Sequence, residues 1–142
     1  SKINEAEMLN EWISETQENK LIEKFNTTPG QIRDIILKAE WICHCIIEIA
    51  KFTQTKNLKL IYDFKKIDTR LKYGIKEELI PLVQLKGIGR IRARKLYNAG
   101  IKNIGDISKN QEKMVTILGK IGIDILKELK IDYQKEGTQK TF

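Results

Sequence analysis

The stretch LKGIGRIRARKLYNAG, residues 85–100, decides how this 142-residue chain is interpreted. Gly87 and Gly89 bracket one apolar residue, Ile88, so the chain can turn sharply there and bury that side chain between two helices. The helix that follows begins with backbone N–H groups and the positive end of its dipole, both of which favour an anion. Gly100 is placed to end that helix. The stretch therefore predicts a helix, a glycine hairpin and a second helix that together hold a phosphate.

The apolar residues around the hairpin are in phase with its two glycines. Small and large residues recur at the spacings that pack back under such a turn; they are Leu82, Leu85, Ala93 and Leu96. A bare Gly-x-Gly is more often an ordinary helical turn, which is the alternative interpretation. This pattern, however, resembles the helix-hairpin-helix family of DNA-binding elements at every diagnostic position, which favours a phosphate-binding function.

Basic residues follow the hairpin on the predicted second helix. Arg90 lies beside the turn, and Arg94 lies about 40° from it around the helix, so both are expected to follow one phosphate track. Arg92 projects on the opposite flank and, with Ile91, is expected to meet the first domain or a motor domain. Lys95 points away from the core. The alternative is that all of these are solvated surface charges.

The net charge of +7 is unevenly distributed along the chain. Residues 1–50 hold 5 Lys and Arg against 9 Asp and Glu, a net charge of −4, whereas residues 51–142 hold 21 against 10, a net charge of +11. The hairpin lies in the basic part, so a polyanion such as DNA is the expected partner there. No apolar run is long enough to span a bilayer, so we expect no membrane partner and a cytoplasmic protein that works with the chromosome.

No cofactor or metal is expected within this chain. Cys43 and Cys45 are the only cysteines and flank the only histidine, His44. A zinc site would need a second pair of ligands, which the sequence lacks.

Apolar residues recur at helical spacing throughout, and no alternating run of strand length occurs. The sequence therefore predicts an all-α chain: a helical bundle over residues 1–73, followed by a compact helix-hairpin-helix domain over residues 74–142. Beyond the hairpin helix and one long helix, helical segments are expected at about 5–25, broken or as two helices, and at 58–73, 76–84 and 103–109.

The long helix is predicted to run from Thr28 to about Phe52. Thr28, Pro29 and Gln31 form a capping box with proline at the first helical position. One wide apolar arc is expected to be buried; it comprises Ile32, Ile35, Ile36, Ala39, Ile42, Cys43, Ile46, Ile47 and Ala50. Trp41 points the other way, and either packs on a neighbouring element or offers a stacking plane to a nucleobase.

The hairpin pattern partly repeats at an offset of 33 residues. Gly122 takes the place of Gly89, while Lys120 replaces the first glycine and Leu126 replaces the small alanine. These differences predict a degenerate second hairpin, in which Lys120 is a further candidate for contact with DNA.

Three stretches resemble the C-terminal region of archaeal Hel-type DNA repair helicases, the Hjm/HelQ family. They are EWISETQENKLIEKF (11–25), TPGQIRDIILKAEWI (28–42) and RLKYGIKEELIPLVQLKGIGRIRARKLYNAGI (70–101). In that family, two ATP-binding motor domains and a winged helix precede a bundle with a ratchet helix, and a small helix-hairpin-helix domain then grips the single strand. This sequence contains no GxxxxGK[ST] loop, so ATP and Mg²⁺ would belong to a motor outside it.

By this resemblance, residues 31–52 correspond to the ratchet helix and Trp41 to its base-stacking aromatic residue. The family places an arginine two turns before that tryptophan, whereas Asp34 stands there in this chain. Arg33 is one residue earlier, about 80° from Trp41 around the helix. Arg33 and Lys38 are therefore the candidates for phosphate contact from this helix. The arginine-rich motif that the family associates with DNA contact and motor braking corresponds to Arg90, Arg92 and Arg94.

Three functions remain open. The first is a non-catalytic, DNA-binding region of a 3′ to 5′ helicase, whose partners would be single-stranded or forked DNA, motor domains in the same polypeptide and other repair or replication proteins. The second is a free-standing module that binds DNA or, through Ile91, a protein. The third is a DNA glycosylase with Asp106 as its acid, although Ile91 stands where bifunctional glycosylases have a catalytic lysine.

Overall fold

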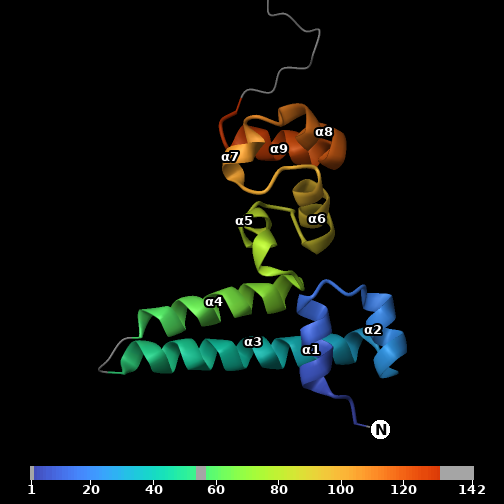
Figure 1. Cartoon of the computed structure of the whole chain (residues 1–142), viewed down its shortest axis with the longest axis vertical. Coiled ribbons are helices and arrows are strands. Elements are labelled where there is room, and N and C mark those ends of the chain that lie inside the picture. Colours follow the sequence, from blue (N-terminus) through green and yellow to red (C-terminus); the bar gives the residue numbers. More distant parts are fainter. Residues whose placement is uncertain (1, 54–56, 132–142) are drawn as a thin grey trace, which may run out of the picture. The chain divides into compact units, whose positions relative to one another are not determined.

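The computed structural model describes residues 2–53 and 57–131 (Figure 1). All regular elements in those residues are helices, which confirms the all-α prediction. The chain divides into two compact units, Ser1–Ile80 (unit 1) and Pro81–Phe142 (unit 2). The division thus falls after residue 80, whereas the sequence pattern placed a boundary between residues 73 and 74.

Unit 1 is built on two long helices that lie side by side; one short helix, α1, contacts both of them, and the other, α2, contacts α3 (Figure 1). The predicted break within residues 5–25 separates α1 from α2. The helices are α1 (Glu5–Ile13), α2 (Glu18–Phe25), α3 (Pro29–Phe52) and α4 (Leu58–Tyr73), followed by a 3₁₀ turn, η1 (Glu77–Leu79).

Helix α3 begins where its capping box predicts. The Thr28 side chain accepts a hydrogen bond from the Gln31 backbone N–H, and the Gln31 side chain accepts one from the Thr28 N–H. Both otherwise unpaired donors at the helix start are thereby satisfied. Helix α4 ends at Gly74, whose φ of +66° is the left-handed conformation that glycine adopts without strain.

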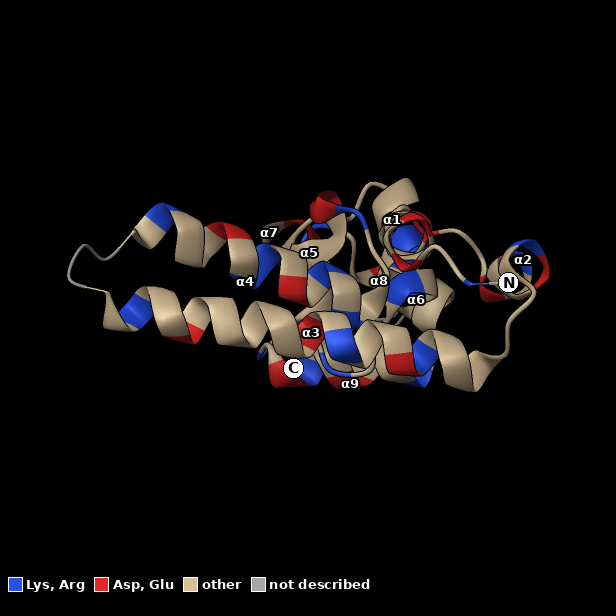
Figure 2. Cartoon of the chain, turned by 90° about the horizontal axis from the view of Figure 1, so that it is seen from below, with Lys and Arg blue, Asp and Glu red and all other residues tan. Residues whose placement is uncertain are grey.

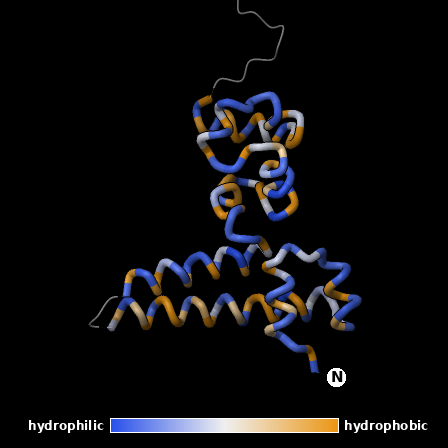
Figure 3. Tube along the Cα trace, viewed as in Figure 1, coloured by the Kyte–Doolittle hydropathy of each residue, from blue (hydrophilic) through white to orange (hydrophobic). Residues whose placement is uncertain are grey.

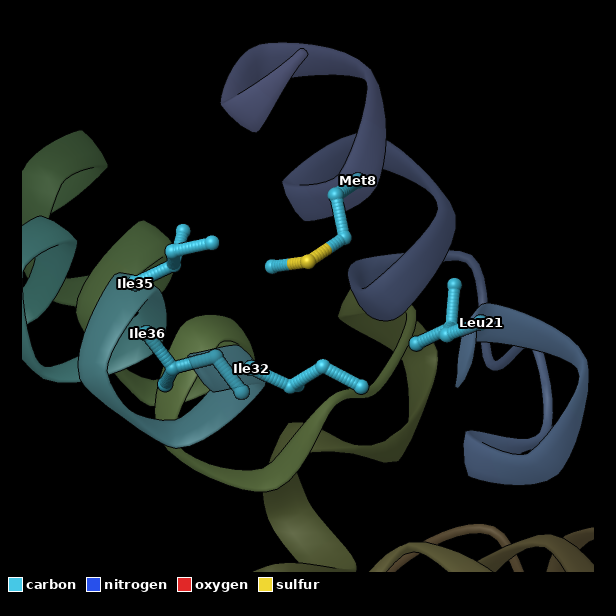
Figure 4. Packing of buried hydrophobic residues seen from close by; sticks show 5 residues of the cluster. All are labelled: Met8, Leu21, Ile32, Ile35 and Ile36. Carbon is cyan, nitrogen blue, oxygen red and sulfur yellow. The ribbon is translucent and has the colours of Figure 1, made fainter. Parts of the chain in front are cut away.

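Two apolar clusters hold unit 1 together. The first joins α1, α2 and the beginning of α3, whose side chains point toward one another in Figure 4; it comprises Met8, Leu21, Ile32, Ile35 and Ile36. The second joins the far end of α3 to the start of α4 through Ile47, Ala50 and Ile61. Because late residues of α3 meet early residues of α4, the two helices run antiparallel.

The buried arc of α3 is narrower than the sequence predicted. Ile42 was expected to be buried, but 47% of its surface is exposed. It lies at the edge of the arc, whose centre, from Ile32 to Ala50, is buried. The tube in Figure 3 shows hydrophobic segments recurring along α3. Beyond the first cluster α4 is the main neighbour of α3 among the described helices, and one neighbouring helix covers a narrower stripe than a full bundle would.

The start of unit 1 is fastened to the C-terminal end of α4. The Trp12 indole Nε1 donates a hydrogen bond of 2.7 Å to the Leu71 carbonyl oxygen. The ring also lies against Gly74, where an added Cβ would come within 2.6 Å of it. Beyond the helix, the Lys76 N–H donates to the Glu15 carboxylate at 3.0 Å.

Unit 2 consists of short helices. The beginning of this unit differs from the prediction. A single helix over residues 76–84 was expected, but η1 is followed by one helical turn, α5 (Ile80–Val83). Pro81 explains the break, because it has no N–H to donate to the carbonyl of Glu77, and the Ile80 N–H takes that acceptor in a 3₁₀ turn. The remaining helices are α6 (Arg90–Asn98), α7 (Ile104–Ile107), α8 (Gln111–Leu118) and α9 (Lys120–Glu128).

The second hairpin differs from the pattern that predicted it. Helices α8 and α9 are joined by Gly119 alone, with φ +61° and ψ −129°, so that Lys120 is already the first residue of α9. Gly122, expected in the turn, lies inside α9 and packs on α8. A Cβ at Gly122 would come within 2.4 Å of the Met114 carbonyl oxygen. Gly122 therefore serves close helix packing here and does not form part of the turn.

No helix among residues 2–53 and 57–131 combines the length and apolar character needed to cross a bilayer.

Candidate nucleic-acid interface

The glycine hairpin lies between α5 and α6 and turns at Gly87. Gly87 has φ +81°, and Ile88 is 97% buried, with 3% of its surface exposed. Gly89 is the N-cap of α6 and has extended backbone, with φ −101° and ψ −164°. A Cβ built on Gly89 meets no atom within 4 Å. The space in front of the first turn of α6 is thus open. Gly89, the N-cap, has no side-chain oxygen that could accept a hydrogen bond from the first backbone N–H groups of the helix.

The Arg92 side chain contacts the hairpin of its own unit. Its Nη1 donates a hydrogen bond of 3.0 Å to the Gly87 carbonyl oxygen. The sequence assigned Arg92 to a partner beyond this domain, but helical periodicity could not show that the side chain reaches back across the turn. The contact stabilises the left-handed Gly87 and directs the positive charge of the guanidinium toward the loop.

The other basic residues of α6 are marked by blue segments of its ribbon in Figure 2. Arg90 is half-buried beside the hairpin, and Lys95 is exposed. The Arg94 guanidinium carbon lies 5.1 Å from the centroid of the Tyr97 ring, a cation–π distance.

Lys120 is exposed at the start of α9, outside the hairpin turn. The face of the hairpin toward α9 is acidic. A cavity of about 350 Å³ there is lined by Lys86, Gly87, Asp124 and Glu128, among others. Two carboxylates oppose an anion on that side, so the side of the hairpin that faces away from α9 favours phosphate.

Trp41 presents its ring to solvent. Its exposed fraction is 67%, and it lies opposite the buried arc of α3, as the sequence predicted. Within the described residues, the Trp41 ring therefore does not pack on a neighbouring element, and its stacking on a base stays a prediction. Leu37, one turn earlier on the same helix, is 47% exposed and extends this apolar surface.

Arg33 lines a groove that the sequence did not reveal. The groove has a volume of about 630 Å³ and lies between the first turns of α3 and the last turn of α4. Its walls include Arg33, Lys72 and Tyr73, so two cations and an aromatic ring from distant parts of the sequence meet there, together with the carboxylates of Glu18 and Glu40. Asp34 lines a different cavity, beside Asn4 and Gln31. No sequence signal pointed to Lys72 or Tyr73, because their proximity depends on how α3 and α4 pair.

Lys38 forms an ion pair within the chain, so a ligand would have to compete for its ammonium group. Its Nζ lies 2.8 Å from the Glu5 carboxylate at the start of α1. Both side chains are exposed, and such surface pairs contribute about 0 to 1 kcal/mol, so a phosphate can displace the carboxylate at little cost.

The cysteines and histidine take structural positions. Burial raises the pKa of the Cys43 thiol, with the nearby Asp68 and Glu40 carboxylates adding to the effect. His44 Nε2 lies 2.9 Å from an Asp68 carboxylate oxygen, which links α3 to α4. Burial is also the main cause that raises the pKa of Glu40. Within the described ranges, no group of three or more His, Cys, Asp or Glu side chains is arranged to hold a metal ion.

Asp106, the candidate glycosylase acid, forms local structure. Its carboxylate accepts a hydrogen bond of 3.0 Å from the Lys102 N–H. Its own N–H donates to the Asn103 side chain, the N-cap of α7. These bonds explain an aspartate at this position as part of the turn into α7.

Comparison with known proteins identifies the family. Residues 1–74 match the family described as archaeal helicase, domain 4. The ATP-dependent DNA helicase Hel308 of Methanococcus vannielii is 40% identical over 132 residues, which are 92% of this chain and 18% of that protein. The Hel308 proteins of Methanocaldococcus jannaschii and Pyrococcus horikoshii are 41% and 40% identical, over 92% and 87% of this chain and 11% and 17% of their own lengths.

The chain thus spans less than a fifth of the length of these curated relatives. The family match covers more than half of its residues. This chain therefore belongs to the archaeal helicase domain 4 family and corresponds to the C-terminal region of an archaeal superfamily 2 helicase.

Proposed function

We propose that this chain is the DNA-binding accessory region of an ATP-dependent, 3′ to 5′ DNA helicase that processes forks during repair and replication. It catalyses no reaction of its own in this proposal, and ATP and Mg²⁺ bind to motor domains of the same polypeptide. Its substrate is single-stranded or forked DNA in the cytoplasm, with other repair or replication proteins nearby. The names of the relatives, all ATP-dependent DNA helicases, support this assignment.

One observation carries the DNA-binding role: the N-terminus of α6 is open to a ligand at Gly89. The first amides of a helix and its dipole attract an anion, and a glycine at the cap lets a phosphate approach the backbone closely. Arg90 lies directly beside this position. Such contacts read the DNA backbone and not the base sequence, so binding should be independent of sequence.

Unit 1 contributes a second kind of contact in this proposal. Exposed Trp41 stacks on a base of the strand, while Arg33 and Lys72, in the groove on the neighbouring flank of α3, bind its phosphates. Lys38 exchanges Glu5 for a phosphate. Asp34 stands where the resembled family has an arginine. In this proposal the neighbouring Arg33 supplies the positive charge close to that position.

The hairpin role predicts that Gly89→Ala weakens binding of a single-stranded oligonucleotide roughly tenfold while the fold survives. The new methyl group would stand in the open space where the phosphate binds, and hydrogen bonds to charged groups contribute about 1.5 to 3 kcal/mol. The protein itself can accept alanine there, because φ is −101° and no atom lies within 4 Å. Alanine is a poorer N-cap, which costs about 0.5 kcal/mol. Fluorescence anisotropy titrations at several salt concentrations measure the loss.

Gly100→Ala is the matched control at the other end of α6. Gly100 has φ +91° and open space around it, so alanine there strains the backbone by about 1 to 2 kcal/mol without blocking the hairpin. We expect Gly100→Ala to lower the melting temperature and to cost clearly less DNA affinity than Gly89→Ala, because the hairpin amides stay open. Full DNA affinity in Gly89→Ala would show that the α6 amides do not hold the strand.

A protein-interaction module is the second candidate function, and one observation favours it. Ile91 is 69% exposed on α6, one residue after Arg90. The two functions separate experimentally, since Ile91→Ser should leave oligonucleotide binding intact if this residue serves a protein partner. The glycosylase alternative has less support, because hydrogen bonds within the turn into α7 account for Asp106.

A further inference from the structure

We propose that Tyr97 and the two cations held on its ring, Arg94 and Lys102, form a second phosphate-binding site, distinct from the glycine hairpin. Its ligand is a backbone phosphate of the nucleic-acid strand that the hairpin holds. The inference rests on the proposed DNA-binding function and extends it to residues outside the hairpin.

The two cations converge on a single aromatic ring. The Arg94 guanidinium carbon lies 5.1 Å from the Tyr97 centroid, and the Lys102 Nζ lies 5.2 Å from it. The Arg94 guanidinium carbon and the Lys102 Nζ therefore lie no farther apart than the sum of these two distances. Each is attracted to the ring, while the two like charges repel each other. An anion bound by both relieves that repulsion, and a phosphate has enough oxygens to accept from both side chains.

The fold brings Lys102 to this ring in a fixed way. Gly100, in the left-handed conformation, reverses the chain at the end of α6. Ile101 is fully buried, and its N–H donates to the Leu96 carbonyl at 2.9 Å. The next N–H, that of Lys102, donates to the Asp106 carboxylate at 3.0 Å. The backbone of Lys102 is thus held on both sides, so its side chain starts from a defined position.

The charges around the ring favour an anion. Lys113 adds a third positive charge at this end of α6, where its Nζ donates to the Ala99 carbonyl oxygen at 3.3 Å. The Asp106 carboxylate is engaged by the backbone N–H of Lys102, and the Lys102 ammonium forms no ion pair in the part of the chain that is described. Lys102 is exposed, and Tyr97 and Arg94 are half-buried.

The site lies on the same flank of α6 as the residues beside the hairpin. Arg90, Arg94 and Tyr97 fall within about 60° around the helix, and Arg90 precedes Arg94 by one turn, about 6 Å. A strand whose phosphate rests on the hairpin amides can therefore continue along this flank and place another phosphate between Arg94 and Lys102.

The test uses the whole chain and a single-stranded oligonucleotide, with affinity measured across a salt series. We expect Lys102→Gln and Arg94→Gln each to weaken binding roughly threefold to tenfold. If both cations serve one phosphate, the double variant should lower the slope of log affinity against log salt by about 0.7, whereas two independent phosphates would lower it by about 1.4. Lys20→Gln, on the exposed side of α2 in unit 1, carries the same charge change and should leave affinity unchanged.

Tyr97 provides a test that leaves the charge unaltered. Tyr97→Leu removes the ring that positions both cations and should weaken binding about as much as the double variant. Tyr97→Phe retains the ring and should bind like the wild type, and circular dichroism checks that both variants fold. A Tyr97→Leu protein that is folded and binds normally, a slope change near 1.4, or a Lys102→Gln protein that matches Lys20→Gln would each overturn the proposal. If Gly89→Ala also binds normally, the proposed DNA-binding function fails as well; if Gly89→Ala alone loses affinity, only the second phosphate site fails.

Discussion

Replacing Gly122 with alanine should lower the free energy of unfolding of unit 2 by about 2 to 3 kcal/mol. The Cβ would come within 2.4 Å of the Met114 carbonyl oxygen, a backbone atom of α8 that no side-chain rotation can move. Helices α8 and α9 would have to separate, and with them the packing around Leu118 and Leu126, both buried. The better helix propensity of alanine, worth about 1 kcal/mol, offsets only part of this cost.

Thermal unfolding measured by circular dichroism should show a melting temperature lower by on the order of 10 °C. Amide hydrogen exchange should locate the loss of protection in α8 and α9. Gly30→Ala is the control, because Gly30 is also helical but its added Cβ would lie 3.9 Å from the nearest atom, the Thr28 hydroxyl oxygen. Alanine there should stabilise α3 slightly. A Gly122→Ala protein as stable as the wild type would show that α8 and α9 are not so closely packed.

Trp41→Ala should weaken binding of single-stranded DNA by about 1 to 3 kcal/mol, roughly 5- to 150-fold, which is the usual contribution of one aromatic residue that stacks on a base. Stability should change by less than about 0.5 kcal/mol, because the ring is 67% exposed and no part of the core depends on it. Since stacking is not ionic, the slope of affinity against salt should stay the same. Anisotropy titrations and thermal unfolding of the same samples separate the two effects.

Phe52→Ala is the matched control for Trp41→Ala. Phe52 is 86% exposed at the end of the same helix, about 16 Å along its axis from Trp41. It lies far from Arg33 and the groove between α3 and the end of α4, so its removal should leave DNA affinity unchanged. Equal losses from both substitutions would indicate nonspecific apolar adsorption, and no loss from either would exclude stacking on this helix.

Features set by neighbouring residues could be predicted from the sequence. The capping box at Thr28 located the start of α3, and Gly74 located the end of α4. Trp41 was correctly placed opposite the buried arc. Each of these depends on backbone chemistry or helical period within a few residues, which a single sequence contains.

Features that depend on tertiary contact could not be predicted. A repeat offset of 33 residues aligned Gly122 with Gly89, although Gly119 makes the turn. The hydrogen bond from Arg92 to Gly87 reverses the direction assigned to that side chain. The meeting of Lys102 with the Tyr97 ring likewise depends on a chain reversal whose geometry the sequence pattern does not encode.

The fastening of α1 to the end of α4 also determines how unit 1 bears mechanical load. The Trp12 indole is bonded to the Leu71 carbonyl, and the Glu15 carboxylate is bonded to the Lys76 N–H, just where the chain continues beyond α4. Tension applied to the chain beyond Lys76 is therefore shared by α1 and α4. Both contacts would have to break before the end of α4 could separate from α1.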